Sequence, residues 1–301
     1  MKRIFRLLIL FGLALSACGP ATPTGEPVPT APQPTATPAP TATATPSLAP
    51  TATFAYPPEG LGPADFPADV NPLTGLVVAD PAYLDRRPLL VKVENLPRNH
   101  RPQYGLSQAD LVYEYYTEEG TTRFIALFYG QDAATVGPIR SARFIDAHIV
   151  RGYKAILAFG SGDERVRDRL FRSEFADRLV VESPTTPLRR IDPGGYNLLV
   201  VDTAELSRYA YQHGVDNVRQ DLDGMFFQAE PPAGGEPAVQ LTVRYSAAIY
   251  NRWDYDPSTG RYLRSVDVQN DLSGGENEVY EPLVDRNTGQ QLAFDNVVVL
   301  Y

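Results

Sequence analysis

A proline-rich stretch near the N-terminus cannot be part of a packed domain. Ten of the 28 prolines lie between Pro20 and Pro50, and residues 19–53 are almost entirely Pro, Thr and Ala, with Glu26 as the only charge. The stretch has no apolar periodicity, so it lacks the side chains that a core requires. Because such a chain favours extended polyproline II structure, we expect residues 18–69 to form a disordered tether that spans ~100–150 Å.

A secretory signal precedes this tether. Three basic residues lie within the first six positions, and residues 4–15 form an apolar run that is too short to span a bilayer. The run ends in Leu15-Ser16-Ala17-Cys18, which resembles the bacterial lipobox. This resemblance implies lipidation of the Cys18 thiol and cleavage before it, so residues 1–17 are predicted to be a signal peptide.

The lipid anchor predicts the cellular location of the protein. Acyl chains on Cys18 hold a protein at a membrane surface, which places the chain on the extracytoplasmic face of the bacterial cell membrane. Loss of residues 1–17 changes the net charge from −9 to −12, and an acidic body is repelled by anionic lipid. We therefore expect the lipid to do the anchoring. The alternative is an ordinary cleaved signal with an incidental cysteine.

Composition restricts the classes of function. The negative net charge argues against a nucleic-acid partner, and a single cysteine excludes an intrachain disulfide. The three histidines are scattered along the chain, and no G-x-S-x-G nucleophile elbow occurs. We therefore expect no cofactor, no metal centre and no nucleophilic triad.

Residues 70–230 are predicted to form an α/β (α+β) domain with a mixed sheet. Runs of β-branched and aromatic residues predict strands, and apolar residues at helical spacing predict helices. Strands are expected at 89–94, 111–117, 123–129, 155–159, 179–181 and 198–201, and helices at 142–153, 164–172 and 203–213, the last capped by Thr203. Strands and helices that alternate in this way are typical of a mixed sheet covered by helices.

The pattern changes after the linker-like residues 231–235. Strands are predicted at 239–245, 249–255, 261–266 and 297–301, with a tight turn at 256–260. Residues 236–301 are therefore expected to form a smaller, mostly β domain, with the boundary near Pro231.

Several short motifs together resemble one bacterial family. They are Asn71-Pro72-Leu73-Thr74-Gly75, Arg101-Pro102-Gln103, residues 105–110, Thr122-Arg123-Phe124, residues 137–143, Trp253-Asp254-Tyr255, Tyr262-Leu263-Arg264 and residues 296–299. Their order over residues 70–301 is similar to that of the YerB-like lipoproteins, a family of unknown function with N- and C-terminal halves. The resemblance implies an envelope lipoprotein and supplies no reaction. It also implies a chain that continues past residue 301, so we expect a truncated C-terminus.

The densest group of chemistry-bearing residues contains Arg123, Arg140, Ser141 and Arg143. Arg140 and Arg143 lie at the start of a predicted helix, where backbone N–H groups and the helix dipole favour an anion. Two guanidiniums there can hold a phosphate or a carboxylate, and Ser141 adds a hydroxyl. The alternative is structural pairing of these arginines with nearby carboxylates, namely Glu114, Glu118, Glu119 and Asp146.

Four further residues are weaker candidates: Asp110, Glu118, Asp146 and His148. Asp110 and Glu118 share the parity of one strand face with Glu114, and their oxygens suit Mg²⁺ or Ca²⁺. That face also holds apolar residues, so the spacing is weak evidence for a metal. His148 lies on the predicted helix near the arginines, where ordinary packing is the alternative.

These observations favour a non-enzymatic binding or scaffold lipoprotein of the cell envelope, with a cell-wall glycan or another envelope protein as its partner. The alternative is an envelope enzyme that acts on a phosphorylated or glycan substrate, by loose analogy with the LytR-CpsA-Psr phosphotransferases. In that analogy Asp110, Arg123, Arg140 and Arg143 take the acidic and basic roles. The sequence identifies no catalytic residue.

Overall fold

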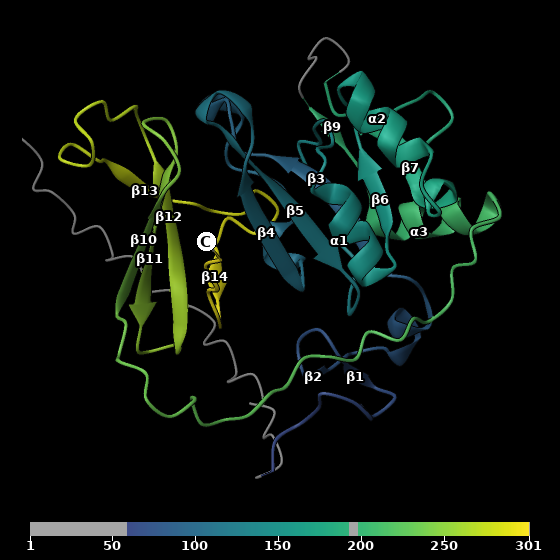
Figure 1. Cartoon of the computed structure of the whole chain (residues 1–301), viewed down its shortest axis with the longest axis horizontal. Coiled ribbons are helices and arrows are strands. Elements are labelled where there is room, and N and C mark those ends of the chain that lie inside the picture. The colour runs from purple at the N-terminus through teal and green to yellow at the C-terminus, as the bar shows by residue number, and fades with distance from the viewer. Residues whose placement is uncertain (1–58, 193–197, 301) are drawn as a thin grey trace, which may run out of the picture. The chain divides into compact units, whose positions relative to one another are not determined.

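The computed structural model describes residues 59–192 and 198–300. The predicted signal peptide, Cys18 and most of the predicted tether lie outside these residues. The described residues belong to one compact unit, which contains two five-stranded sheets (Figure 1). The N-terminal sheet is mixed and covered by helices, and the C-terminal sheet is antiparallel, so the predicted fold class is confirmed.

The N-terminal sheet has the strand order β4-β5-β3-β6-β7. Its central strand β3 (Leu89–Glu94) pairs antiparallel with β5 (Thr122–Phe128) and parallel with β6 (Ile156–Phe159). The edge strands are β4 (Leu111–Tyr116) and β7 (Leu179–Val181). Every residue of β3 is buried, as expected for a strand that is covered on both faces.

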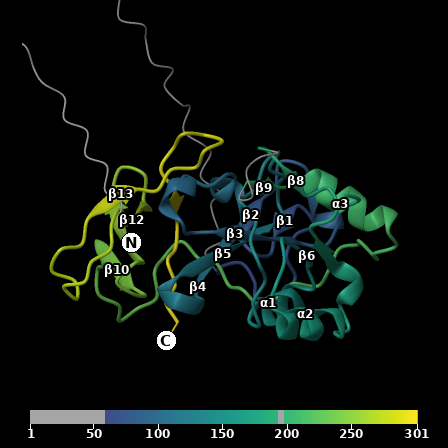
Figure 2. The same ribbon diagram turned by 90° about the horizontal axis from the view of Figure 1, so that it is seen from above.

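Helices cover both faces of this sheet. Helices α1 (Asp146–Tyr153) and α2 (Glu164–Phe171) lie on one face, and α3 (Thr203–Gln212) lies on the other (Figure 2). Successive β3 residues point to opposite faces, so Leu90 joins the core beneath α1 and α2, whereas Val91 joins the core beneath α3. The strand therefore supports two apolar cores at once.

The remaining described elements are short or belong to the second sheet. Two further two-stranded sheets comprise β1 (Val70–Asn71) with β2 (Leu76–Val77), and β8 (Arg189–Arg190) with β9 (Leu199–Val200). Short 3₁₀ helices lie at Pro81–Asp85, Arg98–His100, Leu106–Gln108, Glu118–Gly120 and Ala176–Arg178. The C-terminal sheet contains β10 (Gln240–Arg244), β11 (Tyr250–Asp256), β12 (Arg261–Asp267), β13 (Tyr280–Pro282) and β14 (Ala293–Phe294).

Helix α1 begins later than the sequence pattern predicts. Residues 142–145 were expected to be helical, yet α1 starts at Asp146. The reason is tertiary: the Ala142 N–H donates to Ser161 O at 2.8 Å, and the Gly160 N–H donates to Arg140 O at 3.0 Å. These two bonds to the loop after β6 hold residues 140–142 in a non-helical path, so the helix begins only after them.

The cap of α3 also differs from the prediction. Asp202, not Thr203, is the N-cap residue: its Oδ1 accepts hydrogen bonds from Ala204 N at 2.8 Å and Glu205 N at 3.2 Å. The Thr203 hydroxyl accepts instead from Ala133 N at 2.8 Å. Thr203 therefore ties the helix start to the loop after β5.

The predicted strand at 297–301 does not form within the described residues. Residues 296–300 have no regular structure, and Val298 and Leu300 are 78% and 86% exposed. The neighbouring strand β12 is already paired with β11 on one side and with β13 and β14 on the other. Residues 296–300 pair with no strand of the described chain, so their apolar pattern alone does not produce a strand.

The segment that enters the domain is tied to the segment between the two sheets. Leu61 and Phe227 exchange backbone hydrogen bonds of 2.8 and 2.9 Å, and the Gly224 N–H donates to Pro63 O at 2.7 Å. The residues around Leu61, which the sequence assigned to the tether, are therefore part of the folded unit. The long segment after α3, which includes Pro231, runs past β1 and β2 before it reaches β10 (Figure 1).

The two five-stranded sheets share an apolar core. One cluster of buried residues includes Phe124 of the N-terminal sheet together with Val266, Leu283 and Leu292 of the C-terminal part. Asp267 at the end of β12 pairs with Arg101, whose Nη2 lies 3.0 Å from its Oδ1. The sheets are thus joined by apolar packing and by buried ion pairs.

A buried carboxylate lies in this junction. Glu114 of β4 accepts hydrogen bonds from Asn95 Nδ2 at 3.0 Å and Thr122 Oγ1 at 2.7 Å in the N-terminal part. From the C-terminal sheet it accepts bonds from Asn251 Nδ2 at 3.0 Å and Arg264 Nη2 at 2.7 Å. The Arg264 guanidinium also stacks over aromatic rings from both sheets, those of Phe124 and Trp253.

Removal of the Glu114 carboxylate is expected to weaken the junction strongly. The Glu114→Ala variant leaves the guanidinium of Arg264 buried without its counter-ion, which destabilises proteins by about 3–5 kcal/mol. Urea unfolding measures this difference in the free energy of unfolding. The exposed Glu281→Ala in β13 is the control and should change it by no more than about 0.5 kcal/mol. A loss below about 1 kcal/mol for Glu114→Ala would contradict the assignment.

Candidate functional site

The three predicted arginines meet at one edge of the N-terminal sheet. Arg123 lies near the start of β5 and is paired in register with Glu94, the last residue of β3. Residues 140–143 cross the same edge and hydrogen-bond to the loop that follows β6. The parallel strands β3, β6 and β7 all end here, and in open α/β sheets ligands bind at the carboxyl ends of such strands.

Arg123 and Arg143 converge on one backbone carbonyl. The Nη1 atoms of both side chains donate to Ser141 O, each at 3.3 Å. Arg143 Nη1 also donates to Ala142 O at 2.8 Å. Arg140, Ser141 and Arg143 precede α1 and do not belong to its first turn, so the cluster is an arrangement of side chains and not a helix N-terminus.

Two of the arginines have internal counter-ions. Arg140 Nε donates to Glu94 Oε1 at 2.6 Å, and His100 Nδ1 lies 2.9 Å from the second oxygen of the same carboxylate. Arg143 Nη2 donates to Glu118 Oε2 at 2.6 Å, and its Nε lies 2.5 Å from Oε1. Arg143 therefore pairs with Glu118, one of the carboxylates that the structural alternative named, whereas Arg140 pairs with Glu94, which that alternative did not include.

Arg123 differs from its two neighbours. It contacts the carbonyl of Ser141, and the described part of the chain shows no carboxylate within ion-pair distance of it. Burial lowers the pKa of Arg123 to about 10, and the positive charges of Arg143 and Arg140 act in the same direction. An added anion would stabilise this guanidinium, because an opposite charge nearby favours the charged form.

A buried charged cluster lies beside the arginines. Lys92 of β3 and Asp146 of α1 have side chains that are 0% exposed, and Lys92 Nζ lies 3.2 Å from Asp146 Oδ1. The Tyr115 hydroxyl hydrogen-bonds to both groups. Burial lowers the pKa of Lys92 to about 8, although the negative charge of Asp146 acts to raise it. Burial raises the pKa of Asp146.

Sequence reasoning missed Lys92, although a signal was present. The predicted strand Leu89–Glu94 reads LLVKVE, and a lysine inside such an apolar run needs a partner when the strand is buried, as it is here. The partner is Asp146, which the sequence assigned only to the surroundings of the arginines. The Lys92–Asp146 pair instead fixes the start of α1 against the sheet.

The other predicted residues lie apart from the cluster. Asp110 is at the opposite end of β4, where it accepts hydrogen bonds from Tyr129 N at 2.5 Å and Gly130 N at 3.0 Å. Burial raises its pKa. Glu114 faces the C-terminal sheet, so Asp110, Glu114 and Glu118 do not form one ligand set. His148 is exposed on α1. Within residues 59–192 and 198–300, no group of three or more His, Cys, Asp or Glu residues is placed to hold a metal ion.

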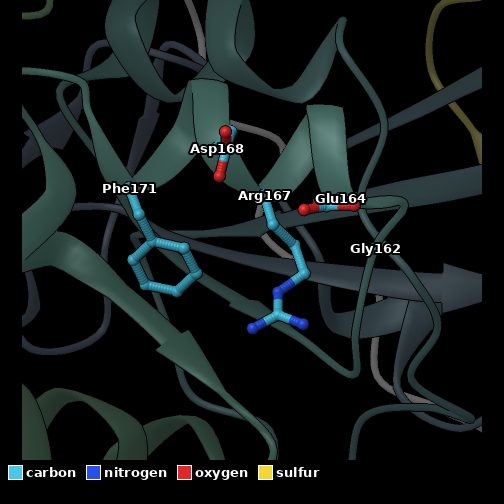
Figure 3. Close-up of a pocket in the computed structure, with 5 residues that line it drawn as sticks. All are labelled: Gly162, Glu164, Arg167, Asp168 and Phe171. Atoms are coloured by element: carbon cyan, nitrogen blue, oxygen red, sulfur yellow. The ribbon is translucent and has the colours of Figure 1, made fainter.

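Two hollows lie beside this edge of the sheet. A surface hollow of about 550 Å³ runs along α2 and is lined by Gly162, Glu164, Arg167, Asp168 and Phe171. Arg167 and Phe171 extend from the same side of the helix (Figure 3). A second hollow of about 40 Å³ is lined by Arg140, Ser141, Ile139, Gly160, Ser161, Glu182, Arg190 and Leu199. The smaller hollow is the one that reaches the arginine cluster.

The buried lysine predicts a pH dependence of stability. Between pH 8 and pH 10.5 the folded protein holds Lys92 neutral while the unfolded chain holds it protonated. The unfolded state then binds more protons, so the free energy of unfolding rises with pH, by at most about 1.4 kcal/mol per pH unit from this group. Below this range the contribution is constant.

Urea unfolding at a series of pH values measures this slope. The double variant Lys92→Met/Asp146→Asn removes both titrating groups and is the control. Wild type should gain stability relative to the double variant as the pH rises from about 8 to about 10. A constant difference between the two proteins over that interval would contradict the burial of a protonatable Lys92.

Comparisons with known proteins agree with the two-part architecture. Residues 73–213 match the family "Protein of unknown function (DUF3048) N-terminal domain", and residues 241–301 match its C-terminal domain. YerB of Bacillus subtilis (strain 168), which is named as a lipoprotein, is 46% identical over 236 residues. This match covers 76% of the chain and 66% of YerB, so the chain spans just under two thirds of that relative's length.

A crystal structure of the YerB protein from Bacillus subtilis has a similar fold. Its TM-score is 0.60 at 26% sequence identity over the superposed residues, which cover 74% of this chain and 71% of that chain. The resemblance drawn from the sequence motifs is thereby confirmed. The chain belongs to the two-domain DUF3048 family, of which YerB is a relative.

Proposed function

We propose that this chain is a lipid-anchored protein of the bacterial cell envelope that binds an anionic partner at the arginine cluster and catalyses no reaction. The anchor rests on the lipobox-like motif that ends in Cys18, and the relative YerB is named as a lipoprotein. Cys18 lies outside the described residues. Within residues 59–192 and 198–300, no helix has the length and apolar character needed to cross a bilayer.

The observation that carries the binding role is Arg123. Its guanidinium is partly buried beside two further guanidiniums; Glu118 and Glu94 act on it from a distance, and no carboxylate of the described residues forms an ion pair with it. The rest of the mature chain is strongly acidic and repels anions. The arginine cluster is a local group of positive charges on this acidic chain. Such a group supports recognition of an anionic moiety on a cell-wall glycan or an acidic segment of an envelope protein.

The arrangement gives little support to the enzyme alternative. Asp110, the acidic residue of that analogy, lies at the far end of β4 and is held by backbone N–H groups. Glu94 and Asp146, which do lie near the arginines, are buried and paired with Arg140 and Lys92. Each nearby carboxylate is therefore used to fix a cation, and binding is the better supported function.

The binding role is tested on Arg123. Calorimetric titration with inorganic phosphate should show saturable binding to wild type and at least about tenfold weaker binding to Arg123→Met, because a charge-assisted bond of about 1.5–3 kcal/mol is lost. Arg165→Met removes an exposed guanidinium from α2 and should leave the affinity unchanged. Equal phosphate affinities of wild type and Arg123→Met would overturn the proposed site.

The anchor is tested separately. A Cys18→Ala variant cannot accept a lipid, so we expect it to leave the membrane fraction and appear in the soluble extracytoplasmic fraction. Cell fractionation followed by immunoblotting measures the distribution. Retention of Cys18→Ala with the membranes at the wild-type level would show that the protein surface or an uncleaved signal, and not a lipid on Cys18, holds the chain there.

A further inference from the structure

Glu118 takes the place in which an external anion would bind. It lies in the 3₁₀ turn Glu118–Gly120 between β4 and β5, and both of its oxygens contact Arg143, at 2.6 Å from Nη2 and 2.5 Å from Nε. One of these contacts, Nη2 to Oε2, is a hydrogen bond, whereas the Arg143 Nε–H has no hydrogen-bond partner among the described residues and is left for another acceptor. A carboxylate of the same chain, Glu118, therefore pairs with Arg143 at the position that an external anion would take.

Of the three carboxylates at the cluster, Glu118 is the one that can leave. The side chains of Glu94 and Asp146 are 2% and 0% exposed, so their release would strand a charge in the core. The side chain of Glu118 is 60% exposed. An ion pair with an exposed partner contributes only about 0–1 kcal/mol, so a competing anion has little to overcome.

The charges at the cluster define what can replace Glu118. Lys92 is balanced by Asp146, Arg140 by Glu94 and Arg143 by Glu118, and only Arg123 has no such partner among the described residues. The cluster therefore carries a formal charge of about +1 with Glu118 in place and about +2 without it. A ligand with two negative charges neutralises the cluster after Glu118 has left. A carboxylate carries one negative charge, so it neutralises the cluster only while Glu118 remains in place.

The geometry places the two available cations side by side. Arg123 and Arg143 already donate to the same carbonyl, that of Ser141. A tetrahedral dianion with three acceptor oxygens can engage two such guanidiniums at once. A single carboxylate has two oxygens, and the carboxylate of Glu118 contacts Arg143 while it forms no ion pair with Arg123.

We propose that Glu118 is an internal substitute for the ligand, and that the ligand is a phosphate dianion which displaces Glu118 and binds Arg123 and Arg143 together. This inference rests on the proposed function and specifies its ligand class and its regulation. The displaced turn is itself held by the second sheet, because the Ser246 hydroxyl donates to Gly120 O at 2.5 Å. Ligand binding is thereby coupled to the contact between the hairpin and the C-terminal part.

The test compares two neighbouring carboxylates. Glu118→Gln removes the competing charge, and Glu119→Gln removes the same charge from the next residue, for which the described chain shows no ion pair. Titration with inorganic phosphate at a pH near 7.5, below the pKa of Lys92, should give about two- to fivefold tighter binding to Glu118→Gln than to wild type. Glu119→Gln should bind as wild type does. Acetate should bind more weakly than phosphate to all three proteins.

The outcomes separate this inference from the proposed function. Phosphate binding to wild type that depends on Arg123 but is unchanged or weakened in Glu118→Gln overturns the substitute role and leaves the anion site in place. Absence of phosphate binding to both wild type and Glu118→Gln overturns the site and the inference together. Acetate that binds as tightly as phosphate overturns the dianion assignment.

Amide hydrogen exchange gives a second, structural readout. The Thr121 N–H donates to Glu118 O at 3.1 Å, so release of the turn should speed its exchange. Saturating phosphate should accelerate exchange in residues 117–121 of wild type and have no further effect in Glu118→Gln. Strand β12 is the internal control and should be unaffected. Unchanged exchange in the turn of wild type at saturating phosphate would contradict displacement.

Discussion

The carboxylate of Glu114 lies between the two sheets and accepts hydrogen bonds from both of them. A buried charge destabilises a fold unless its partners are complete, and here Arg264, Asn251 and Thr122 complete them. The requirement favours the observed register of β4 on β5, because a shift of one residue would turn the carboxylate to the other face of the sheet, away from Arg264. The placement of the β4–β5 hairpin, and of the turn at its tip, follows from this contact.

A layer of paired charges continues the apolar core toward the edge of the N-terminal sheet. Leu90 and Ile125 pack beneath the helices, while Lys92 and Arg123, two residues nearer the edge on the same face, are charged. Pairing of Lys92 with Asp146 stabilises the start of α1, and the surplus cation is left at Arg123. The same face of the sheet thus changes from apolar to charged side chains over two residues of each strand.

Much of this fold follows from local sequence. The runs that form β3 and β5 were predicted because their β-branched and aromatic residues suit a buried strand, and the arginines of residues 140–143 were evident from their proximity in the chain. The onset of α1 was missed because contacts with Ser161 override helical spacing. Strand parity placed Glu114 and Glu118 together, yet the chain turns after β4, so one faces the second sheet and the other faces Arg143. Which carboxylate meets which cation depends on register and packing, and no local pattern encodes these.

The bridge between Leu61 and Phe227 determines where mechanical load enters the fold. In a protein held by its N-terminus, tension along the chain reaches Leu61 first, and there it passes to the segment that connects the two sheets. The bridge is a short antiparallel contact outside both five-stranded sheets. The arginine cluster lies at the ends of β3 and β6, among elements that do not include this bridge. A pull on the N-terminal segment therefore meets the Leu61–Phe227 contact before it meets the strands that carry the arginines.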